Sequence, residues 1–255
     1  MRLASPRLFP SLCSALLLAT LAFPAAVAAQ EVGWDVKGEL SASLFFGNTQ
    51  QSIVTTHTNV SHADSTFELG TDARFTYGEA RDGNGESFVS QRSWLGALSA
   101  DFNPFATVSP FLLATVESSF ERRIDLRYSA GAGGKLTMIR RPGAELSVSL
   151  ALLGERSFFP DSVNDTPALV RWSARLKATR EISDRVSLTH VTFYRPEVSA
   201  LGRFTVTSNS SAAYKLNKIT SLTLSFLDNY DSEATSRGAR SNNDGQLVVG
   251  VLAVF

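Results

Sequence analysis

Histidine is the side chain best suited to acid–base chemistry near neutral pH, and the sequence contains three, His57, His62 and His190. A hydrolase would pair one of them with a serine nucleophile and a carboxylate. Because serines are abundant along the whole chain, a chance Ser–His–Asp set cannot be told from a real one by spacing. We therefore interpret the histidines as structural or interior-lining residues, and we expect no catalytic site.

Carboxylates are the second group that could do chemistry, because calcium prefers oxygen ligands. Asp228, Asp231 and Glu233 lie close together in one polar stretch, and Asp161 and Asp165 lie in another. Neither stretch has the ligand spacing of an EF-hand loop. We interpret both as hydrated loops, so the sequence predicts no metal site and no cofactor.

Charged residues that alternate with apolar ones form the largest set of candidates. If the runs that carry them are strands, these side chains share one face of a sheet, opposite the apolar face. They can line a water-filled pore and set its ion preference, or they can form an ion-pair network that fills a narrow interior. Both interpretations stay open, and the mixed signs predict no selectivity. The residues are Asp35, Lys37, Glu39, Glu68, Asp72, Arg74, Arg127, Lys135, Glu145, Arg171, Arg175, Lys177 and Arg203.

Period-two alternation recurs from end to end of the chain and predicts an all-β protein with about twelve strands. Ten or fourteen strands remain possible, because the fourth and ninth runs are poorly phased. Many runs exceed the five or six residues typical of soluble sheets and suit tilted strands that cross a bilayer. The predicted strands are 33–46, 52–62, 65–78, 87–101, 107–119, 124–137, 144–154, 168–180, 185–195, 201–215, 218–229 and 245–255.

The connections between these runs alternate in length. Those after even-numbered runs are mostly tight, such as Leu216-Asn217, whereas several after odd-numbered runs are longer. Short periplasmic turns and longer external loops are typical of outer-membrane barrels. The pattern predicts a transmembrane, antiparallel, up-and-down β-barrel with both termini on the periplasmic side. The longer connections are EARDGNGE, ERSFFPDSVNDTP, PEVSA and YDSEATSRGARSNND.

Aromatic residues gather near both ends of the predicted strands, as expected for the two interfacial girdles of a membrane barrel. The final run ends on Phe255, and its apolar phase includes Leu247, Val249 and Val251. Because a sheet in lipid cannot leave an open edge, this run must pair with the first. The predicted girdle residues are Trp34, Tyr77, Phe102, Trp172, Tyr194, Phe204, Tyr214, Tyr230 and Phe255.

The N-terminus has the pattern of a secretory signal peptide. Arg2 and Arg7 precede an apolar run, and Ala26-Val27-Ala28 supplies the small residues of a cleavage site. We expect residues 1–29 to be removed together with Cys13, and residues 30–255 to form one barrel domain. Without Arg2 and Arg7, 22 basic residues face 24 acidic ones, so no basic excess points to nucleic acid.

Three glycines close together, Gly131, Gly133 and Gly134, interrupt an otherwise regular run. They can thin the wall or let a ligand approach the backbone. More often, glycines in a strand mark a bend, a bulge or a tight neighbour.

Gly47-Asn48-Thr49 and the stretches ELGTDARFTYGEA, SSFERRIDLRYSAGAGGKL and LSVSLALLGERSFF resemble the salt-induced outer-membrane protein family. That family is a bacterial domain family of unknown function. The chain's ending also resembles the C-terminal aromatic signature that the outer-membrane assembly machinery reads. The resemblance implies an outer-membrane barrel and a role in envelope stress, with Phe255 as an assembly signal.

These observations predict a non-enzymatic outer-membrane barrel that serves the envelope under stress, as a narrow passive pore for ions or small solutes. Its expected partners are outer-membrane lipids, lipopolysaccharide and the assembly machinery, and it is expected to be a monomer. Two alternatives remain. One is a lipid-acting barrel enzyme that uses His57 or His190, although outer-membrane phospholipases place histidine and serine two residues apart on one strand, a spacing absent here. The other is a soluble secreted β-sheet binding module.

Overall fold

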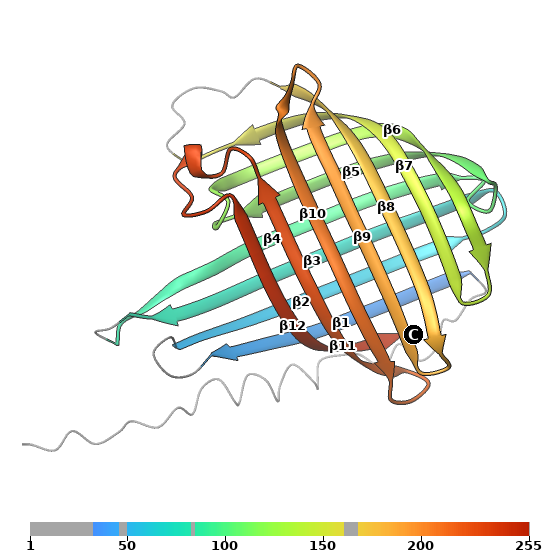
Figure 1. The fold of residues 1–255 in the computed structure, drawn as a ribbon, viewed down its shortest axis with the longest axis horizontal. Coiled ribbons are helices and arrows are strands. Elements are labelled where there is room, and N and C mark those ends of the chain that lie inside the picture. The colour runs from blue at the N-terminus through green and yellow to red at the C-terminus, as the bar shows by residue number, and fades with distance from the viewer. Residues whose placement is uncertain (1–32, 46–49, 83–84, 161–167, 255) are drawn as a thin grey trace, which may run out of the picture. The chain divides into compact units, whose positions relative to one another are not determined.

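The computed structural model describes residues 33–45, 50–82, 85–160 and 168–254. The described chain forms a closed antiparallel barrel in which each strand pairs with its neighbours in sequence (Figure 1). Among the described residues, no helix is long and apolar enough to cross a membrane. The predicted signal peptide, residues 1–29, lies outside the described residues.

Twelve strands and one short 3-10 helix make up the described structure. They are β1 (Trp34–Phe45), β2 (Gln50–Ala63), β3 (Phe67–Arg81), β4 (Ser87–Phe102), β5 (Val108–Ser119), β6 (Ile124–Arg141), β7 (Ala144–Phe158), β8 (Leu169–Ser183), β9 (Val186–Glu197), β10 (Ala200–Lys215), β11 (Thr220–Asp231), η1 (Thr235–Arg237) and β12 (Asn243–Val254). The predicted fold and strand number are therefore confirmed, and the fourth and ninth runs are strands.

One predicted connection is wrong. PEVSA was expected to be a loop, but β9 continues to Glu197 and β10 begins at Ala200, which leaves only Val198 and Ser199 between them. The ladder continues as far as the pair Ala200–Glu197, beyond a register shift that follows Phe204–Pro196. Proline lacks the N–H of a regular ladder, so its presence suggested a strand end. Here the ladder shifts its register and continues past it.

The barrel closes through antiparallel pairing of β1 with β12, from Lys37–Val254 to Ser41–Gly250. The last strand thus pairs with the first, as the sequence predicts. Closure gives every described strand a hydrogen-bonded neighbour on both sides, as burial of a sheet in hydrocarbon requires. Phe255 itself lies outside the described residues.

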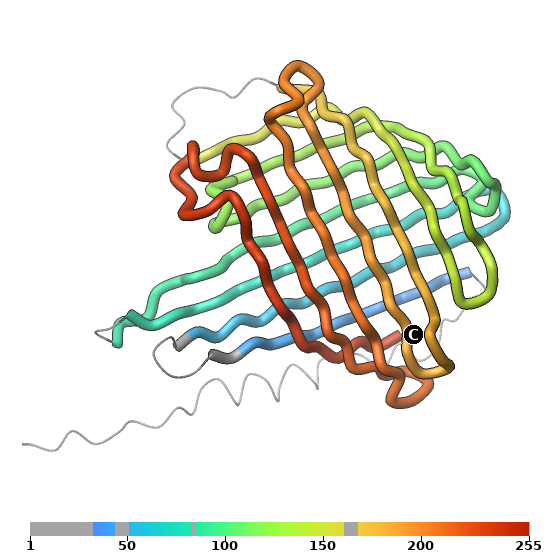
Figure 2. The backbone as a smooth tube through the Cα atoms, viewed as in Figure 1, coloured from blue at the N-terminus to red at the C-terminus, as the bar shows by residue number. Residues whose placement is uncertain are grey.

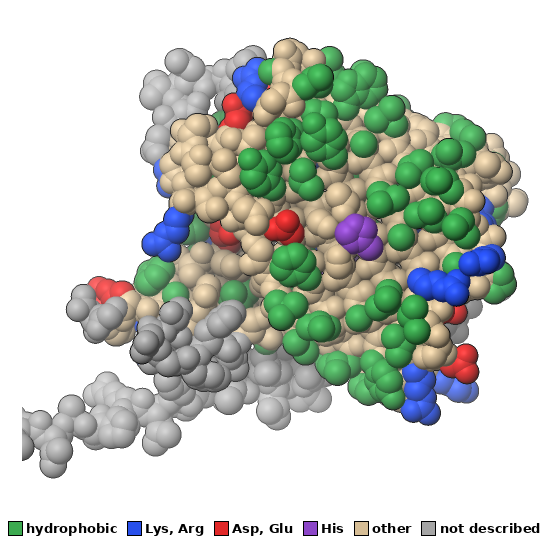
Figure 3. Space-filling view, viewed as in Figure 1, with side chains coloured by type: hydrophobic (Ala, Val, Ile, Leu, Met, Phe, Trp, Pro, Cys, Tyr) green, Lys and Arg blue, Asp and Glu red, His purple; other side chains and the backbone are tan. Residues whose placement is uncertain are grey.

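The two faces of the sheet have the reverse polarity of a soluble protein. Large apolar side chains such as Leu150 and Leu152 point outward and are exposed, whereas Glu155 and Arg171 point inward and are buried. Hydrophobic side chains are spread over the outer face of the barrel, and lysines and arginines lie toward its margins (Figure 3). This reversal is expected of a barrel whose outer surface faces lipid.

The barrel has two different ends. We call the end with the connections 64–66, 103–107, 142–143, 184–185 and 216–219 the turn end, and the opposite end the loop end. The strands of the two opposite walls cross each other in projection, as expected of strands tilted against the barrel axis (Figure 2). Inward side chains from neighbouring strands therefore meet along the lumen.

Candidate functional site

The predicted interior charges lie on the inward phase of the barrel. In β8, for example, Arg171, Arg175 and Lys177 alternate with outward-facing Trp172 and Leu176. Arg203 differs from the rest, because it lies near the loop end with about half of its side chain exposed, 2.8 Å from the buried carboxylate of Glu197. These charges make the lumen the first candidate site.

A continuous chain of ion pairs runs along the inner wall of the neighbouring strands β5 to β8 near the loop end. The Arg122 Nη2 atom lies 2.8 Å from Glu117 Oε2, and Arg127 Nη1 lies 3.2 Å from Glu117 Oε1. Arg127 Nε lies 3.4 Å from Glu155 Oε1, which Arg171 Nε approaches to 3.0 Å. We call these five residues the arginine–glutamate chain.

The strand pattern explains why the arginine–glutamate chain forms. Glu117 of β5 lies directly opposite Arg127 of β6, and both are on the inward phase. Arg127 also donates from Nε to Ser157 Oγ at 2.8 Å, so its hydrogen-bonding groups find acceptors inside the barrel. A buried charge without a partner is costly, so this pairing stabilises the arrangement. The arrangement makes this part of the inner wall dry, with the side chains of Arg127, Glu155 and Arg171 only 6–7% exposed.

Further ion pairs lie along the lumen and the loop-end connection. Lys135 pairs with Asp101, and Lys177 pairs with Glu145 at 3.3 Å. In the connection 232–242, Arg237 pairs with Asp231 and lies 4.0 Å from Glu233. Two of the acidic residues considered as calcium ligands are therefore engaged by an arginine.

No group of three or more histidines, cysteines or acids is arranged to hold a metal within the described ranges. The other two candidates in the connections, Asp161 and Asp165, lie outside those ranges. Asp228 of β11 is opposite Ser208 and on the outward phase, so it does not share a face with Asp231.

His57 lies in the lumen between two carboxylates. Its Nε2 is 2.6 Å from Asp72 Oδ2, and its Nδ1 is 3.9 Å from Glu39 Oε2. The hydroxyl of Thr223 donates to Glu39. A β-carbon at Gly250 would lie 2.9 Å from Glu39 Oε1, so glycine leaves room for this contact. The cluster can hold and pass a proton, but no hydroxyl nucleophile bonds to His57 among the described residues.

His190 lies on the outward face of β9. The sequence alone did not show which residues of this strand point outward. His190 is opposite Ala178 and Ser210, and it shares its phase with the exposed Leu188 and Tyr194. Its ring nitrogens lie 2.8 Å from Ser210 Oγ and 2.8 Å from Thr192 Oγ1. No carboxylate bonds to this ring in the described part of the chain, so the arrangement lacks the acid of a triad.

His62 packs near the turn end against Trp34, with the ring centres 4.9 Å apart. It is a structural residue there. Neither His57 nor His190 forms a Ser–His–Asp set, and none of the three histidines is placed as a catalytic base with both partners.

Two of the three glycines mark a close approach between strands. A β-carbon at Gly131 would lie 2.0 Å from the Leu152 carbonyl oxygen, and one at Gly133 would lie 2.3 Å from the Leu150 carbonyl oxygen. Gly134 differs, because a β-carbon there would meet nothing within 4 Å. The tight-neighbour interpretation holds for the first two, whereas Gly134 lies on the outward face.

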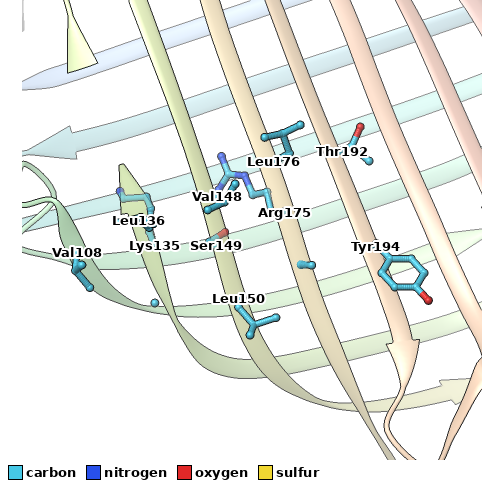
Figure 4. Close-up of a pocket in the computed structure, with 12 residues that line it drawn as sticks. Val108, Lys135, Leu136, Val148, Ser149, Leu150, Arg175, Leu176, Thr192 and Tyr194 are labelled. Carbon is cyan, nitrogen blue, oxygen red and sulfur yellow. The ribbon is translucent and has the colours of Figure 1, made fainter. Parts of the chain in front are cut away.

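An apolar hollow of about 550 Å³ lies on the outward face over Gly134 and Ala174. Its walls include Leu136, Leu150 and Tyr194 (Figure 4). The small residues leave space that longer side chains fill elsewhere. The hollow belongs to the outer surface and not to the lumen. Its apolar lining can receive an acyl chain.

Most predicted girdle aromatics point outward and are exposed: Trp34, Tyr77, Phe102, Trp172, Tyr194 and Tyr214. Phe204 lies between two tyrosines, with its ring centre 5.5 Å from that of Tyr194 and 5.5 Å from that of Tyr230. The three rings form a continuous aromatic cluster toward the loop end. Such clusters suit the level of lipid headgroups.

Sequence analysis missed Glu117, Glu155, Glu197 and Arg195 as interior charges. Glu155 was missed because the seventh strand was predicted to end at residue 154, whereas β7 continues to Phe158. Arg195 falls on the ninth run, whose phase is unclear from sequence, and Glu197 falls in PEVSA, which was predicted to be a loop. Glu117 had a readable signal, because Thr115, Glu117 and Ser119 alternate with apolar or small residues.

Comparison with known proteins identifies a family and a set of barrels. The family model described as protein of unknown function, DUF481, matches residues 38–255. No curated protein matches the sequence. The resemblance to the salt-induced family stays a prediction.

Similar solved structures are bacterial outer-membrane barrels. The translocator domain of the autotransporter NalP from Neisseria meningitidis has 11% identity and a TM-score of 0.49, with 95% of this chain and 96% of that chain covered. The KdgM porin has 13% identity and a TM-score of 0.42, with 88% and 99% covered.

Proposed function

We propose that this chain, which belongs to the family of proteins of unknown function DUF481, is a non-enzymatic outer-membrane barrel that serves as a narrow passive pore for ions and small solutes. One observation carries the proposal: interior ion pairs near the turn end are 16–42% exposed, whereas Arg127, Glu155 and Arg171 near the loop end are only 6–7% exposed. A completely filled interior would expose only the charges at its rim, whereas Lys177 lies well inside β8 and is still one-third exposed.

Water reaches the interior charges near the turn end. The side chains of Asp35 and Lys37 are each 42% exposed, and those of Lys177 and Glu145 are 33% and 37% exposed although they point inward. Side chains that filled a solid core would be buried. The lumen is therefore a polar vestibule at this end.

The lumen narrows toward the loop end. There the side chains of Arg127, Glu155 and Arg171 are only 6–7% exposed. We assign the constriction to the arginine–glutamate chain, since its buried side chains project inward from four neighbouring strands at this level. A twelve-stranded barrel is intermediate between filled eight-stranded barrels and open sixteen-stranded porins, which suits a pore closed down by side chains.

The apolar outer face, the aromatic clusters and the closed sheet support a place in the bacterial outer membrane after export through the periplasm. The turn end would then face the periplasm. Outer-membrane lipids and lipopolysaccharide would surround the barrel, and the C-terminal strand with Phe255 would be read by the assembly machinery. The role in envelope or salt stress rests on the sequence resemblance alone.

Conductance in a planar lipid bilayer tests the pore. We expect the purified, folded protein to give small, stable steps of current in potassium chloride. A Glu155→Ala/Arg171→Ala variant removes two members of the constriction together, so neither charge is left without its partner, and its steps should be larger. Silent membranes with both proteins, each shown to be folded, would refute the pore and leave a structural barrel.

Cell fractionation and heat-modifiable gel mobility test the location. The protein should be recovered with outer membranes, and its unboiled form should migrate differently from the boiled one, because a closed ladder resists detergent. Recovery as a detergent-free particle in the periplasm would favour the soluble binding module instead.

A second candidate function is a lipid-acting enzyme, favoured by the 2.8 Å contact between His190 and the Ser210 hydroxyl on the outward face. Incubation with phospholipid and with lipid A would reveal hydrolysis or acyl transfer that a Ser210→Ala variant loses. Equal product with both proteins, or none, would dismiss it.

A further inference from the structure

Two arginines on the neighbouring strands β8 and β9 have no carboxylate partner among the described residues. Arg175 of β8 and Arg195 of β9 both point inward, and the Nε of each is buried without a hydrogen-bond acceptor. By contrast, every arginine of the arginine–glutamate chain contacts at least one glutamate. Buried hydrogen-bond donors in native structures almost always have an acceptor, so these two unpaired Nε–H groups need an explanation.

Both guanidinium groups lie against one aromatic ring. The central carbon of Arg195 is 4.6 Å from the centre of the Phe193 ring, and that of Arg175 is 5.6 Å from it. Arg175 and Phe193 are opposite each other in the β8–β9 ladder. A ring supports a guanidinium without neutralising its charge, and the planar N–H groups remain able to donate.

The carboxylates that act electrostatically on these arginines are mostly committed elsewhere. For Arg175 they are Asp101, Glu145 and Glu68, of which the first two pair with Lys135 and Lys177. Glu68 makes no ion pair with Arg175 in the described structure.

For Arg195 they are Glu117 and Glu155, and both belong to the arginine–glutamate chain. Arg175 and Arg195 thus place two positive charges without carboxylate partners on the same wall of the lumen, beside Phe193.

We propose that Arg175, Phe193 and Arg195 form a binding station for small solutes that carry a carboxylate or phosphate group, and that the pore consequently prefers anions. The proposal rests on the proposed pore function. Carboxylates and phosphates each accept two parallel hydrogen bonds from one guanidinium, so the free N–H groups match them.

The inward charges of β1 and β3, on the other side of the barrel, also favour passage of anions along β8 and β9. The inward charged residues of β1 and β3 are the four acids Asp35, Glu39, Glu68 and Asp72 and the two cations Lys37 and Arg74, so this wall is acidic by two charges. An anion in the lumen is repelled by that wall and attracted by the arginines of β8 and β9. The solute would therefore travel along the β8–β9 side.

Reversal potentials across a planar bilayer with a potassium chloride gradient test the ion preference. We expect the wild-type pore to pass chloride several-fold more readily than potassium, and an Arg175→Gln/Arg195→Gln variant to lose that preference. The matched control is Lys177→Gln/Glu145→Gln, which changes two inward residues near Arg175 but keeps the net charge. It should retain the wild-type preference.

Binding of citrate and of inorganic phosphate by the detergent-solubilised protein, measured by calorimetry, gives a readout that needs no current. The double glutamine variant should bind citrate at least ~10-fold more weakly, since both forks are lost. An Arg175→Lys/Arg195→Lys variant keeps the charge but not the fork, so it should keep the chloride preference and lose most citrate affinity. Phosphate binding without citrate binding would assign the station to phosphate solutes.

The outcomes separate the two proposals. A conducting pore without chloride preference and without binding of either anion would overturn the station but leave the pore. A silent barrel that still binds citrate through the two arginines would overturn the pore and keep the station as a binding site. Equal binding by wild type and the double glutamine variant would refute the station outright.

Discussion

Replacing Glu155 with glutamine removes the shared counter-ion of two buried arginines. Glu155 Oε1 lies 3.0 Å from Arg171 Nε and 3.4 Å from Arg127 Nε, and its side chain is only 6% exposed. Glutamine has nearly the same shape, so the change alters charge rather than packing. Both guanidinium groups would lose much of their compensation in a dry part of the lumen.

The expected cost is about 3 kcal/mol, the lower end of the range for breaking a buried ion pair by removing one partner. The lower end applies because the glutamine oxygen can still accept one hydrogen bond, and Arg127 keeps its contact with Glu117. A loss of that size reduces the folding equilibrium constant about a hundredfold.

Glu145→Gln is the matched control. Glu145 lies on the same strand and the same inward phase, but its pair with Lys177 is about one-third exposed. Partly exposed pairs are screened by water, so its loss should cost less than about 1 kcal/mol. The difference between the two variants therefore measures how much burial adds to the energetic cost of losing an ion pair.

Urea unfolding in lipid vesicles, followed by tryptophan fluorescence and gel mobility, measures both variants. The Glu155→Gln midpoint should fall well below that of wild type with an unchanged denaturant slope, whereas Glu145→Gln should stay close to wild type. Equal midpoints for the two variants would refute the reasoning, because burial of the network would then carry no energetic consequence.

Three further changes test other parts of the structure. Gly131→Val should prevent stable pairing of β6 with β7 and abolish heat-modifiable mobility, whereas Gly134→Val should fold, because only the first meets backbone atoms. Phe204→Ala should lower the unfolding free energy about 1 kcal/mol more than Phe75→Ala, because Phe75 makes no ring contact among the described residues; equal losses would contradict a role for the aromatic cluster. Asp64 accepts hydrogen bonds from the Thr66 backbone and hydroxyl, which lower its pKa, so its stabilising effect is complete above the ordinary value of 3.8 and disappears as pH falls through the lowered pKa. Asp64→Ala should therefore lower the urea midpoint at neutral pH, and the difference from wild type should shrink in acid; a pH-independent difference would point to the turn geometry instead.

The fold was readable from sequence because a strand in a closed barrel has one apolar and one polar face along its whole length. The twelve predicted runs match the observed strands to within a few residues at each end. The main errors fall at strand ends, at Glu155 and at Pro196, where alternation weakens although the ladder continues. Pairing with a neighbouring strand decides those ends, and a single strand's pattern does not contain that information.

The interior chemistry was only partly readable. Alternation placed Arg127 and Arg171 on the inward phase, but it could not say that Glu155 joins them or that Arg175 is left without a carboxylate. Likewise, the histidines looked equivalent in the sequence, whereas His57 faces the lumen and His190 faces outward.

The sequence alone therefore determined the architecture of this protein: a barrel with reversed polarity, closed by its last strand, with charges inside. Only the tertiary structure decided which charges pair with one another and which interior charges are exposed to water. It also decided that Arg175 and Arg195 have no carboxylate partner among the described residues. The physical reason is how far apart in the chain the residues that determine each property lie. Strand periodicity is a local property set by the backbone, whereas the partner of an inward side chain depends on register, tilt and depth across strands that are distant in the chain.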